Sequence, residues 1–363
     1  MPDKAIVRAE AARLQSIFEN AGGVRVETDI LQPAETLLDL YGEDIRARAY
    51  VTHDPLNGEQ MLRPDFTVPV VQMHMADGAE PARYTYSGEV FRRQENGEGR
   101  ASEYLQVGYE VFDRTDPANA DAEVFSLFEQ ALAPLGLRAA TGDIGILTAA
   151  VRGLSTTERR KSALLRHIWR PRKFRGLLDR FGGREPVAVT RAALLAESDP
   201  MARINTLVGL RSRDEISERI CALHKDAAEP ALSAGEVDLL DDILDLRAKS
   251  PDALRRLQKM AVDMPALTDA VDRMSMRLDA LNDRGTDVSE LDFEASYGRT
   301  SMEYYDGFVF GFYAEDRPDM QSVATGGRYD ALTRVLGQGR EIPAVGGVIR
   351  PDLVLQLPGR DEA

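Results

Sequence analysis

The sequence has almost no cysteine and few histidines, which excludes two kinds of chemistry. Cys221 is the single cysteine in 363 residues, so no intramolecular disulfide can form and no cysteine-based metal site exists. The four histidines are far apart in the sequence and lack HxxxH or HExxH spacing: His53, His74, His167 and His224. We therefore expect neither a metal ion nor another cofactor.

Long apolar runs and an excess of basic residues are also absent. No stretch approaches the length of about 18 apolar residues that a membrane-spanning helix needs, and the N-terminal segment mixes charged with small apolar residues. We expect no signal peptide, no membrane partner and a cytoplasmic location. The 45 basic and 60 acidic residues give a net charge of −15, which disfavours nucleic acid as the main partner.

Apolar spacing predicts several elements in the first half of the chain. A helix is expected at 4–20 and another at 119–135, the second capped by Asn119 or Asp121. A strand is expected over 46–52. A further helix should open in the segment Arg63–Thr67, where Asp65 or Thr67 is a suitable N-cap.

The pattern changes between Ser155 and Val288, where strand alternation nearly vanishes and helical spacing dominates. We interpret 155–288 as a mainly helical insertion domain within a core formed by 1–154 and 289–363. Runs of strands with few crossover helices favour an α+β fold with an antiparallel sheet. Within the insertion, residues 158–184 carry ten basic side chains against two acidic ones.

The segment Tyr104–Phe112 (YLQVGYEVF) is a candidate binding strand. Alternate residues of a strand share a face, so Leu105 and its alternate neighbours form an apolar face, while Gln106, Gly108 and Glu110 form the other. We expect Gly108 to leave an open space between the two polar side chains, as in the floor of a small polar site. The alternative is a solvent-facing polar edge with a bulge at the glycine.

The preceding strand (TYSGEVFRR) ends at a second candidate residue. Arg92 shares a face with Tyr86 and Gly88, and a guanidinium binds carboxylate or phosphate through two parallel hydrogen bonds. Arg92 is therefore a candidate carboxylate clamp. A surface ion pair with Glu95 or Glu98 is the alternative.

Two segments near the C-terminus combine aromatic residues and glycines. The segment 301–314 (SMEYYDGFVFGFYA) predicts an aromatic strand on which Tyr304 and Tyr305 face opposite ways, one into the core and one toward a site. The segment 324–332 (ATGGRYDAL) places two glycines before Arg328 and Tyr329. A tight turn into a helix explains this pattern without a ligand.

Together, four segments resemble the catalytic core of class II aminoacyl-tRNA synthetases, specifically the histidyl-tRNA synthetase family. MLRPDFTVPV resembles that family's LRPEGT segment, and GEVFRRQENGEGRASEYLQVGYEVF resembles its motif 2. MEYYDGFVF resembles its LDYY histidine-recognition segment, and TGGRYDAL resembles its AGGRYDGL. The order and spacing match over nearly the whole chain. The resemblance implies an antiparallel sheet flanked by helices.

The resemblance also implies a histidine pocket. Asp65 and Thr67 would hold the α-amino group, and Arg92 would lie beside the carboxylate. Gln106 and Glu110 would line the floor, with Glu110 accepting an imidazole N–H, and three tyrosines would form the walls. The complete implied set is Asp65, Thr67, Arg92, Gln106, Glu110, Tyr304, Tyr305 and Tyr329.

The chain departs from the synthetase pattern at the residues that serve ATP. Thr300 occupies the position of an activating arginine, and Arg299 is one position off. Motif 3 is GVIRPDLVL, with Asp352–Leu353 where Glu–Arg would be and with Arg350 out of register. Only eight residues follow Leu355, fewer than the roughly 50 that an anticodon-binding domain needs.

A retained histidine pocket beside lost ATP residues resembles the regulatory subunits of ATP phosphoribosyltransferase. In that family the subunit has no activity of its own and assembles with a short-form catalytic subunit at the first step of histidine biosynthesis. The subunit is implicated in feedback inhibition by histidine. The resemblance implies a hetero-oligomer, a self-dimer through the synthetase-like core, and histidine as the effector.

Two other functional hypotheses stay open. A synthetase-like enzyme that activates an amino acid would need Arg299 and Arg350 to reach the nucleotide. A tRNA-binding synthetase paralogue would use the basic run 158–184 with Trp169 and Phe174. The same run is also typical of a solvated helical face or a docking surface for an acidic partner.

Overall fold

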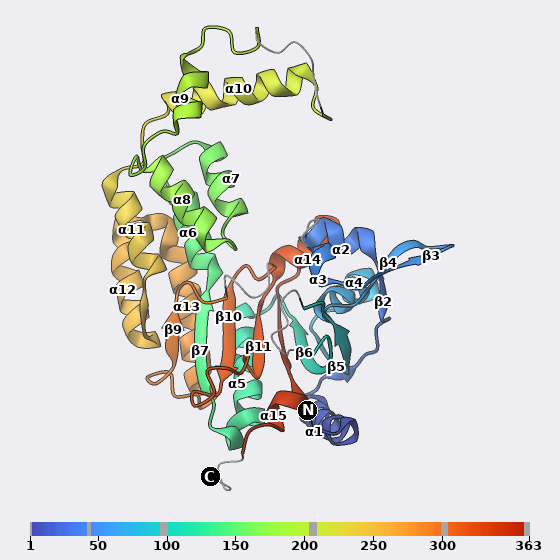
Figure 1. The fold of residues 1–363 in the computed structure, drawn as a ribbon. Coiled ribbons are helices and arrows are strands. Elements are labelled where there is room, and N and C mark those ends of the chain that lie inside the picture. The colour runs from blue at the N-terminus through green and yellow to red at the C-terminus, as the bar shows by residue number, and fades with distance from the viewer. Residues whose placement is uncertain (1, 42–44, 95–100, 203–208, 299–303, 359–363) are drawn as a thin grey trace.

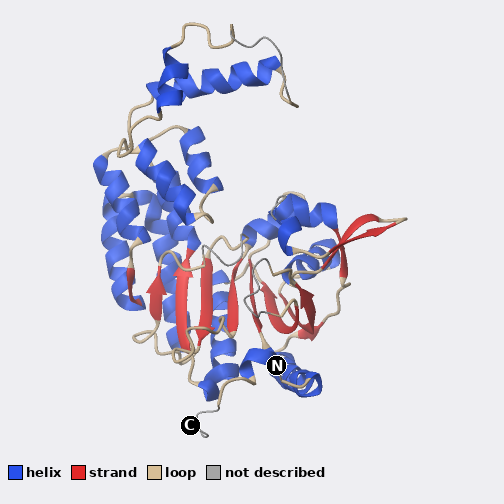
Figure 2. Cartoon of the chain, in the orientation of Figure 1, coloured by secondary structure: helices blue, strands red, loops and turns tan. Residues whose placement is uncertain are grey.

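The computed structural model describes residues 2–41, 45–94, 101–202, 209–298 and 304–358 (Figure 1). Within these ranges, a large sheet with helices packed around it forms the body of the molecule (Figure 2). The strands of this sheet are β1 (Val24–Arg25), β5 (Ala82–Phe91), β6 (Glu103–Phe112), β7 (Arg138–Asp143), β8 (Arg247–Lys249), β9 (Asp292–Glu294), β10 (Phe308–Tyr313), β11 (Ala324–Arg328) and β12 (Ala344–Ile349).

The sheet is mostly antiparallel, as the sequence predicted. Its strand order is β1-β5-β6-β12-β11-β10-β7-β9-β8. Only the β1–β5 and β7–β9 pairs are parallel among the described strands. An α+β fold is therefore confirmed, and β6 lies inside the sheet between β5 and β12.

A second, smaller sheet lies at one end of the molecule, with strand order β2-β4-β3. The elements around it are β2 (Leu31–Pro33), α2 (Ala34–Tyr41), α3 (Ile45–Arg48), β3 (Val51–Asp54) and β4 (Gly58–Leu62). The strand expected over 46–52 was therefore wrong in its first part. The short helix α3 brings Arg46 against Glu59 of β4, with 2.8 Å between Nη2 and Oε2.

The two helices predicted on the first half of the core are present, with one corrected boundary. The first is α1 (Lys4–Asn20), which buries Val7, Ala11, Leu14 and Phe18 along one side. The second is α5 (Pro117–Leu132), and its N-cap is Asp116, whose side chain accepts a hydrogen bond from the Asn119 backbone N–H. Capping by Asn119 or Asp121 was wrong because Asp116 and Pro117 begin the helix earlier.

Helices dominate the described part of residues 155–288, as expected. In and beside this segment the helices are α6 (Ile144–Gly153), α7 (Glu158–Arg166), α8 (Pro171–Phe181), α9 (Val189–Ala196), α10 (Arg213–Ala228), α11 (Ala234–Leu244), α12 (Ser250–Asp263) and α13 (Thr268–Asp283). The segment also contributes β8 to the large sheet, and α13 packs against α5. The separate insertion domain stays a prediction.

The two faces of β6 have different surroundings. α1 and α5 pack on one face, where Phe18 of α1 stacks near Tyr109 with ring centres 5.4 Å apart. The other face carries Gln106 and Glu110 and lies toward α4 (Thr67–Asp77). Near the C-terminus, α14 (Asp330–Leu336) and α15 (Pro351–Val354) follow β11 and β12. None of the described helices is long and apolar enough to cross a bilayer.

Candidate functional site

Glu110 is the centre of a buried polar cluster on β6. Its side chain is fully buried, and three hydroxyl groups donate hydrogen bonds to its carboxylate. Tyr86 and Thr67 donate to Oε1 at 2.7 and 3.1 Å, and Tyr329 donates to Oε2 at 2.6 Å. We call these four residues the Glu110 cluster. The hydroxyl groups stabilise a carboxylate that would otherwise be costly to bury.

Two opposing effects act on the pKa of the Glu110 carboxyl group. Burial raises its pKa to about 7, although the hydrogen bonds from the three hydroxyl groups act in the opposite direction. Burial also holds the pKa values of Tyr86 and Tyr329 well above the ordinary value, so both remain hydroxyl donors at neutral pH. The cluster can therefore exchange a proton near neutrality.

Gly108 does not leave the open floor that we expected. Tyr86 lies directly opposite Gly108 in the β5–β6 register, and a Cβ atom at Gly108 would overlap the Tyr86 ring. Phe66 stacks on the other side of that ring, with ring centres 4.4 Å apart. The glycine thus makes room for a neighbouring tyrosine, which supplies a hydroxyl group to Glu110. Sequence reasoning did not identify Tyr86 as a site residue.

A glycine in β12, which pairs with the edge of β6 opposite β5, also makes room for the Glu110 cluster. Gly346 lies opposite Glu110 in the β12–β6 register. A Cβ atom at Gly346 would overlap Glu110 Oε2, so a glycine is needed for the carboxylate to lie flat against this strand. The glycine-rich C-terminal strand therefore shapes the site without contributing a side chain.

Gln106 lies on the same face of β6 as Glu110 and is also buried. Its amide Oε1 has no hydrogen-bond partner among the described residues. A buried amide oxygen without a donor is costly, so this position favours an N–H donor from a ligand. The α-amino group of an amino acid is such a donor.

Asp65 and Arg92 lie at the edge of the site. Asp65 is buried and accepts a 3.4 Å hydrogen bond from the Val68 backbone N–H, although the N-cap of α4 is Phe66 and not Asp65 or Thr67 as predicted. Arg92 Nε donates to the Pro64 carbonyl oxygen at 2.8 Å. Both side chains are thus anchored to the turn that opens α4.

Tyr304 and Tyr305 precede β10 and do not belong to a strand, so the prediction of opposite strand faces was wrong. Tyr304 donates to Thr67 Oγ1 at 3.3 Å, and its ring centre lies 6.1 Å from that of Tyr329. Tyr305 is buried, and its pKa is raised by burial and by the charge of Glu110. Both tyrosines therefore belong to the surroundings of the Glu110 cluster.

Arg350 is half-buried near the end of β12. Its Nη1 donates to the Ser322 carbonyl oxygen at 2.8 Å, and its Cζ lies 5.8 Å from the ring centre of Tyr104. Burial lowers its pKa. The predicted departures at Arg299 and Thr300 lie outside the described residues, and so do Glu95 and Glu98, the alternative partners of Arg92.

This fold and this site define a protein of the histidyl-tRNA synthetase class, and the family model described as histidyl-tRNA synthetase matches residues 2–354. A solved structure from Bacillus halodurans, titled as an ATP phosphoribosyltransferase regulatory subunit/histidyl-tRNA synthetase, aligns with a TM-score of 0.68 at 22% identity, covering 99% of this chain and 82% of that one. A histidyl-tRNA synthetase from a Nostoc species aligns with a TM-score of 0.65 at 16% identity, covering 97% and 71%.

The curated relatives identify a narrower family within this class. An ATP phosphoribosyltransferase regulatory subunit from Brucella anthropi is 31% identical over 355 residues, which cover 92% of this chain and 93% of the relative. The protein of the same name from Brucella canis is 32% identical over 359 residues, covering 93% and 94%. The chain belongs to the family of ATP phosphoribosyltransferase regulatory subunits.

Proposed function

We propose that this chain is the non-catalytic regulatory subunit of an ATP phosphoribosyltransferase, a glycosyltransferase. It acts with a short-form catalytic subunit that joins ATP and phosphoribosyl pyrophosphate at the first step of histidine biosynthesis. The observation that carries this proposal is the relationship to regulatory subunits at 31–32% identity over more than nine-tenths of both chains.

The Glu110 cluster is the proposed histidine site for feedback inhibition. Glu110 accepts an imidazole N–H after one of its three hydroxyl donors turns away, and a charged acceptor strengthens such a bond in a buried site. The unpaired Gln106 Oε1 and the carboxylate of Asp65 favour the α-amino group. Arg92 receives the α-carboxylate. Regulation then requires histidine to bind one state of the assembly more tightly than the other.

The surroundings of Arg350 support a subunit without synthetase activity. Arg350 is half-buried and donates to the Ser322 carbonyl oxygen, which draws its guanidinium away from a nucleotide phosphate. The neighbouring Asp352 adds a negative charge where the synthetase family has a motif 3 Glu–Arg pair. A synthetase-like reaction would instead appear as histidine-dependent ATP–pyrophosphate exchange by the chain alone.

The first test measures phosphoribosyl transfer by a short-form catalytic subunit titrated with this chain. We expect the rate to rise to a plateau at a fixed ratio of the two subunits, and histidine to lower the rate of the complex. A rate that stays constant across the titration contradicts the regulatory proposal. Exchange activity in the isolated chain would favour the synthetase-like alternative.

The second test measures histidine binding by calorimetry. Glu110→Ala removes the imidazole acceptor, and we expect affinity to fall at least about tenfold, consistent with the loss of a hydrogen bond to a charged group. Glu218→Gln, on the exposed face of α10, is the matched control and should bind as the wild type does. Equal histidine affinity in both variants would remove Glu110 from the site.

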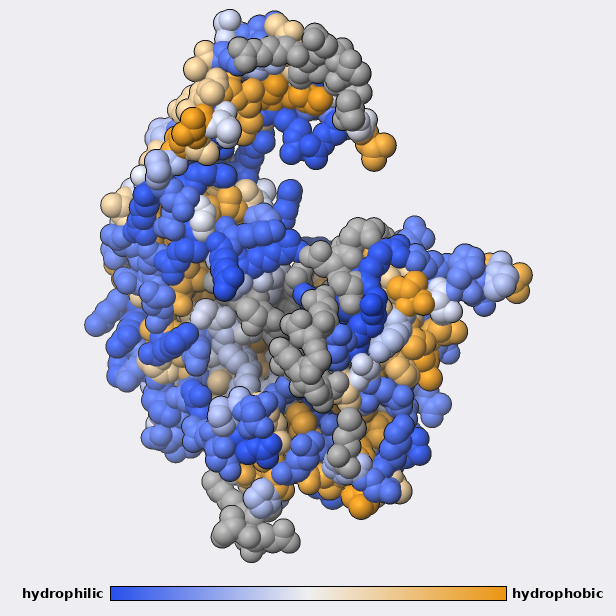
Figure 3. All heavy atoms as spheres, in the orientation of Figure 1, coloured by the Kyte–Doolittle hydropathy of each residue, from blue (hydrophilic) through white to orange (hydrophobic). Residues whose placement is uncertain are grey.

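A self-dimer through the synthetase-like core is also proposed. Exposed apolar side chains gather at the smaller sheet, where Leu31 is 46% and Tyr50 is 38% exposed. Leu31 pairs with Leu62 of β4, and the Leu62 backbone N–H donates to the Tyr50 carbonyl oxygen, so the three residues form a row across this sheet. Hydrophobic residues, drawn in orange, are visible on this side of the molecule (Figure 3). A second copy would cover this row.

A further inference from the structure

A cavity of about 80 Å³ lies across β6 from the Glu110 cluster. β12 pairs with β6 only from Val107 onward, so none of the described strands pairs with the first residues of β6 on that edge. The first turns of α1 and the short helix α15 close the space that remains. A cavity of this size is large enough for several water molecules or a small organic molecule.

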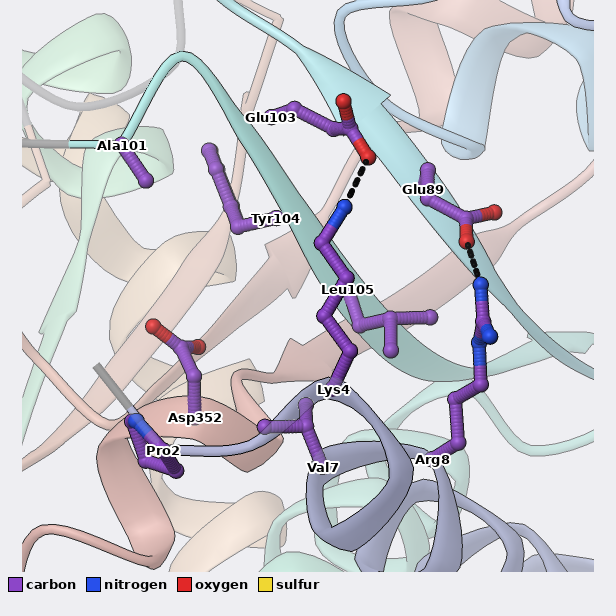
Figure 4. Close-up of a pocket in the computed structure, with 10 residues that line it drawn as sticks. All are labelled: Pro2, Lys4, Val7, Arg8, Glu89, Ala101, Glu103, Tyr104, Leu105 and Asp352. Atoms are coloured by element: carbon purple, nitrogen blue, oxygen red, sulfur yellow. Dashed lines mark hydrogen bonds and ion pairs between the residues drawn. The ribbon is translucent and has the colours of Figure 1, made fainter.

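The walls of the cavity are apolar and its rim is charged (Figure 4). Val7, Leu105 and Tyr104 form much of the wall. Two ion pairs lie at the rim, Lys4–Glu103 at 3.2 Å and Arg8–Glu89 at 3.6 Å. The side chains of Lys4 and Arg8 are 80% and 65% exposed, so these pairs contribute little to stability and open easily.

Asp352 of α15 adds a different kind of group. Its Oδ1 atom is buried and has no hydrogen-bond partner within the part of the chain that the structure describes. Burial raises the pKa of Asp352, while backbone N–H groups and the charge of Arg350 act in the opposite direction. The two rim glutamates are paired with Lys4 and Arg8, whereas Asp352 Oδ1 has no hydrogen-bond donor among the described residues. A ligand N–H would satisfy it, and a positive charge would strengthen the bond.

We propose that this cavity is a second ligand site that binds a small organic ammonium ion with an apolar body. The apolar part packs between Val7 and Leu105, and the ammonium group donates to Asp352. No part of this binding step requires histidine or the catalytic subunit.

The same cavity is connected to the proposed histidine site through one ring. Tyr104 lines the cavity, and its ring centre lies 5.9 Å from the guanidinium carbon of Arg92 and 5.8 Å from that of Arg350. A ligand that moves Tyr104 therefore shifts Arg92. This coupling to histidine affinity rests on the proposed function, because it assumes that Arg92 receives the histidine carboxylate.

The binding test uses the full chain with labelled valine and leucine methyl groups, observed by NMR. Isobutylammonium, isobutanol and isobutyrate have similar shapes but differ in charge. We expect isobutylammonium to shift the Val7 and Leu105 methyl signals saturably, with at least about tenfold tighter binding than the alcohol. Isobutyrate should produce no saturable shift.

Three variants test which side chains bind isobutylammonium. Asp352→Asn should weaken isobutylammonium binding at least about tenfold, and Asp279→Asn on the exposed face of α13 should leave it unchanged. Leu105→Phe fills the cavity and should abolish binding while the other methyl signals remain those of folded protein. Equal binding of alcohol and ammonium, or unchanged binding by Asp352→Asn, overturns the proposal.

The coupling test repeats histidine calorimetry with and without saturating isobutylammonium. We expect a change of about threefold or more in histidine affinity, absent in Asp352→Asn. An identical histidine affinity in both conditions overturns the coupling. If histidine does not bind at all, the proposed function fails, whereas the NMR titration still decides the ammonium site.

Discussion

At the scale of single residues, Glu110 links burial to proton binding. Its carboxyl group is enclosed by three hydroxyl donors and by the backbone of β12, and burial raises its pKa from an ordinary value of 4.5 to about 7. The folded protein therefore holds this proton in a pH range where the unfolded chain has released it. Stability must depend on pH through this one side chain.

The sign of this dependence follows from the raised pKa. Between pH 4.5 and 7 the Glu110 side chain binds more protons in the folded state than in the unfolded state, so its contribution to the free energy of unfolding is fully present below pH 4.5 and is lost as pH rises through 7. Glu110 alone should account for a loss of about 3 kcal/mol, since one pKa unit corresponds to about 1.4 kcal/mol. Urea unfolding at a series of pH values measures this loss.

Glu110→Gln is the matched variant for the pH experiment because its amide does not titrate. Burial also raises the pKa of Asp306 to about 7, but that contribution is present in both proteins and cancels in their difference. The unfolding free energy of the variant minus that of the wild type should therefore increase with pH up to about 7. A difference that is constant with pH would contradict the assigned role of Glu110.

The site residues show what sequence alone can and cannot predict. Alternation along β6 correctly placed Gln106 and Glu110 on one face, because that rule depends only on strand geometry. The role of Gly108 was missed because its neighbour in space, Tyr86, is set by the pairing of β5 with β6. Register and side-chain packing between strands are not local properties of either segment.

At the scale of elements, one buried network joins the helical segment to the sheet that holds the site. Arg277 of α13 contacts Asp121 of α5 at 3.2 Å and Asp143 at the end of β7 at 2.8 Å. Arg328 of β11 contacts the other oxygen of Asp121 at 2.7 Å. The next residue, Tyr329, donates to Glu110. The network thus connects α13 to the residue beside the Glu110 cluster.

Removing one partner from this network should destabilise the fold strongly. Arg277→Met keeps much of the apolar bulk but leaves Asp143 buried without its cationic partner, and we expect a loss of about 3 kcal/mol in the free energy of unfolding. Arg273→Met, one turn earlier on the exposed face of α13, is the control and should cost less than about 0.5 kcal/mol. Chemical denaturation of the two variants measures the difference.

A similar loss of stability in both arginine variants would mean that Arg277 does not link α13 to the sheet.

Spacing along the chain predicted α1 and the helical character of 155–288 because both depend on local apolar periodicity. It did not predict α3, where Arg46 meets Glu59 of β4 across a sheet. It also did not predict that β8 joins the large sheet, since pairing with β9 is a long-range contact.

At the scale of the whole molecule, the apolar row on the smaller sheet and the proposed dimer make a direct prediction. Replacing Leu31 and Tyr50 by glutamate places two charges in the row, and burying unpaired charges at an interface is costly. We expect the double variant to be monomeric where the wild type is dimeric, by analytical ultracentrifugation. The variant should remain folded, because both side chains are solvent-exposed in the single chain.

Val262→Glu is the control for the ultracentrifugation experiment. Val262 is 80% exposed on α12, away from the smaller sheet, and its substitution should leave the wild-type association unchanged. A wild-type protein that sediments as a monomer at all concentrations would refute the dimer. Dimers that persist in the double variant would place the interface elsewhere.

The fit between Gly346 and Glu110 has a consequence for how such chains are recognised. The glycines of the C-terminal strand belong to a segment that synthetases use beside ATP, yet here Gly346 is required by a carboxylate on the next strand. This glycine pattern can therefore be retained for a reason of packing that does not involve ATP, because the buried Glu110 side chain needs the space. Searches that treat the pattern as a signature of ATP use will collect regulatory subunits together with enzymes, and the arginines around it must separate them.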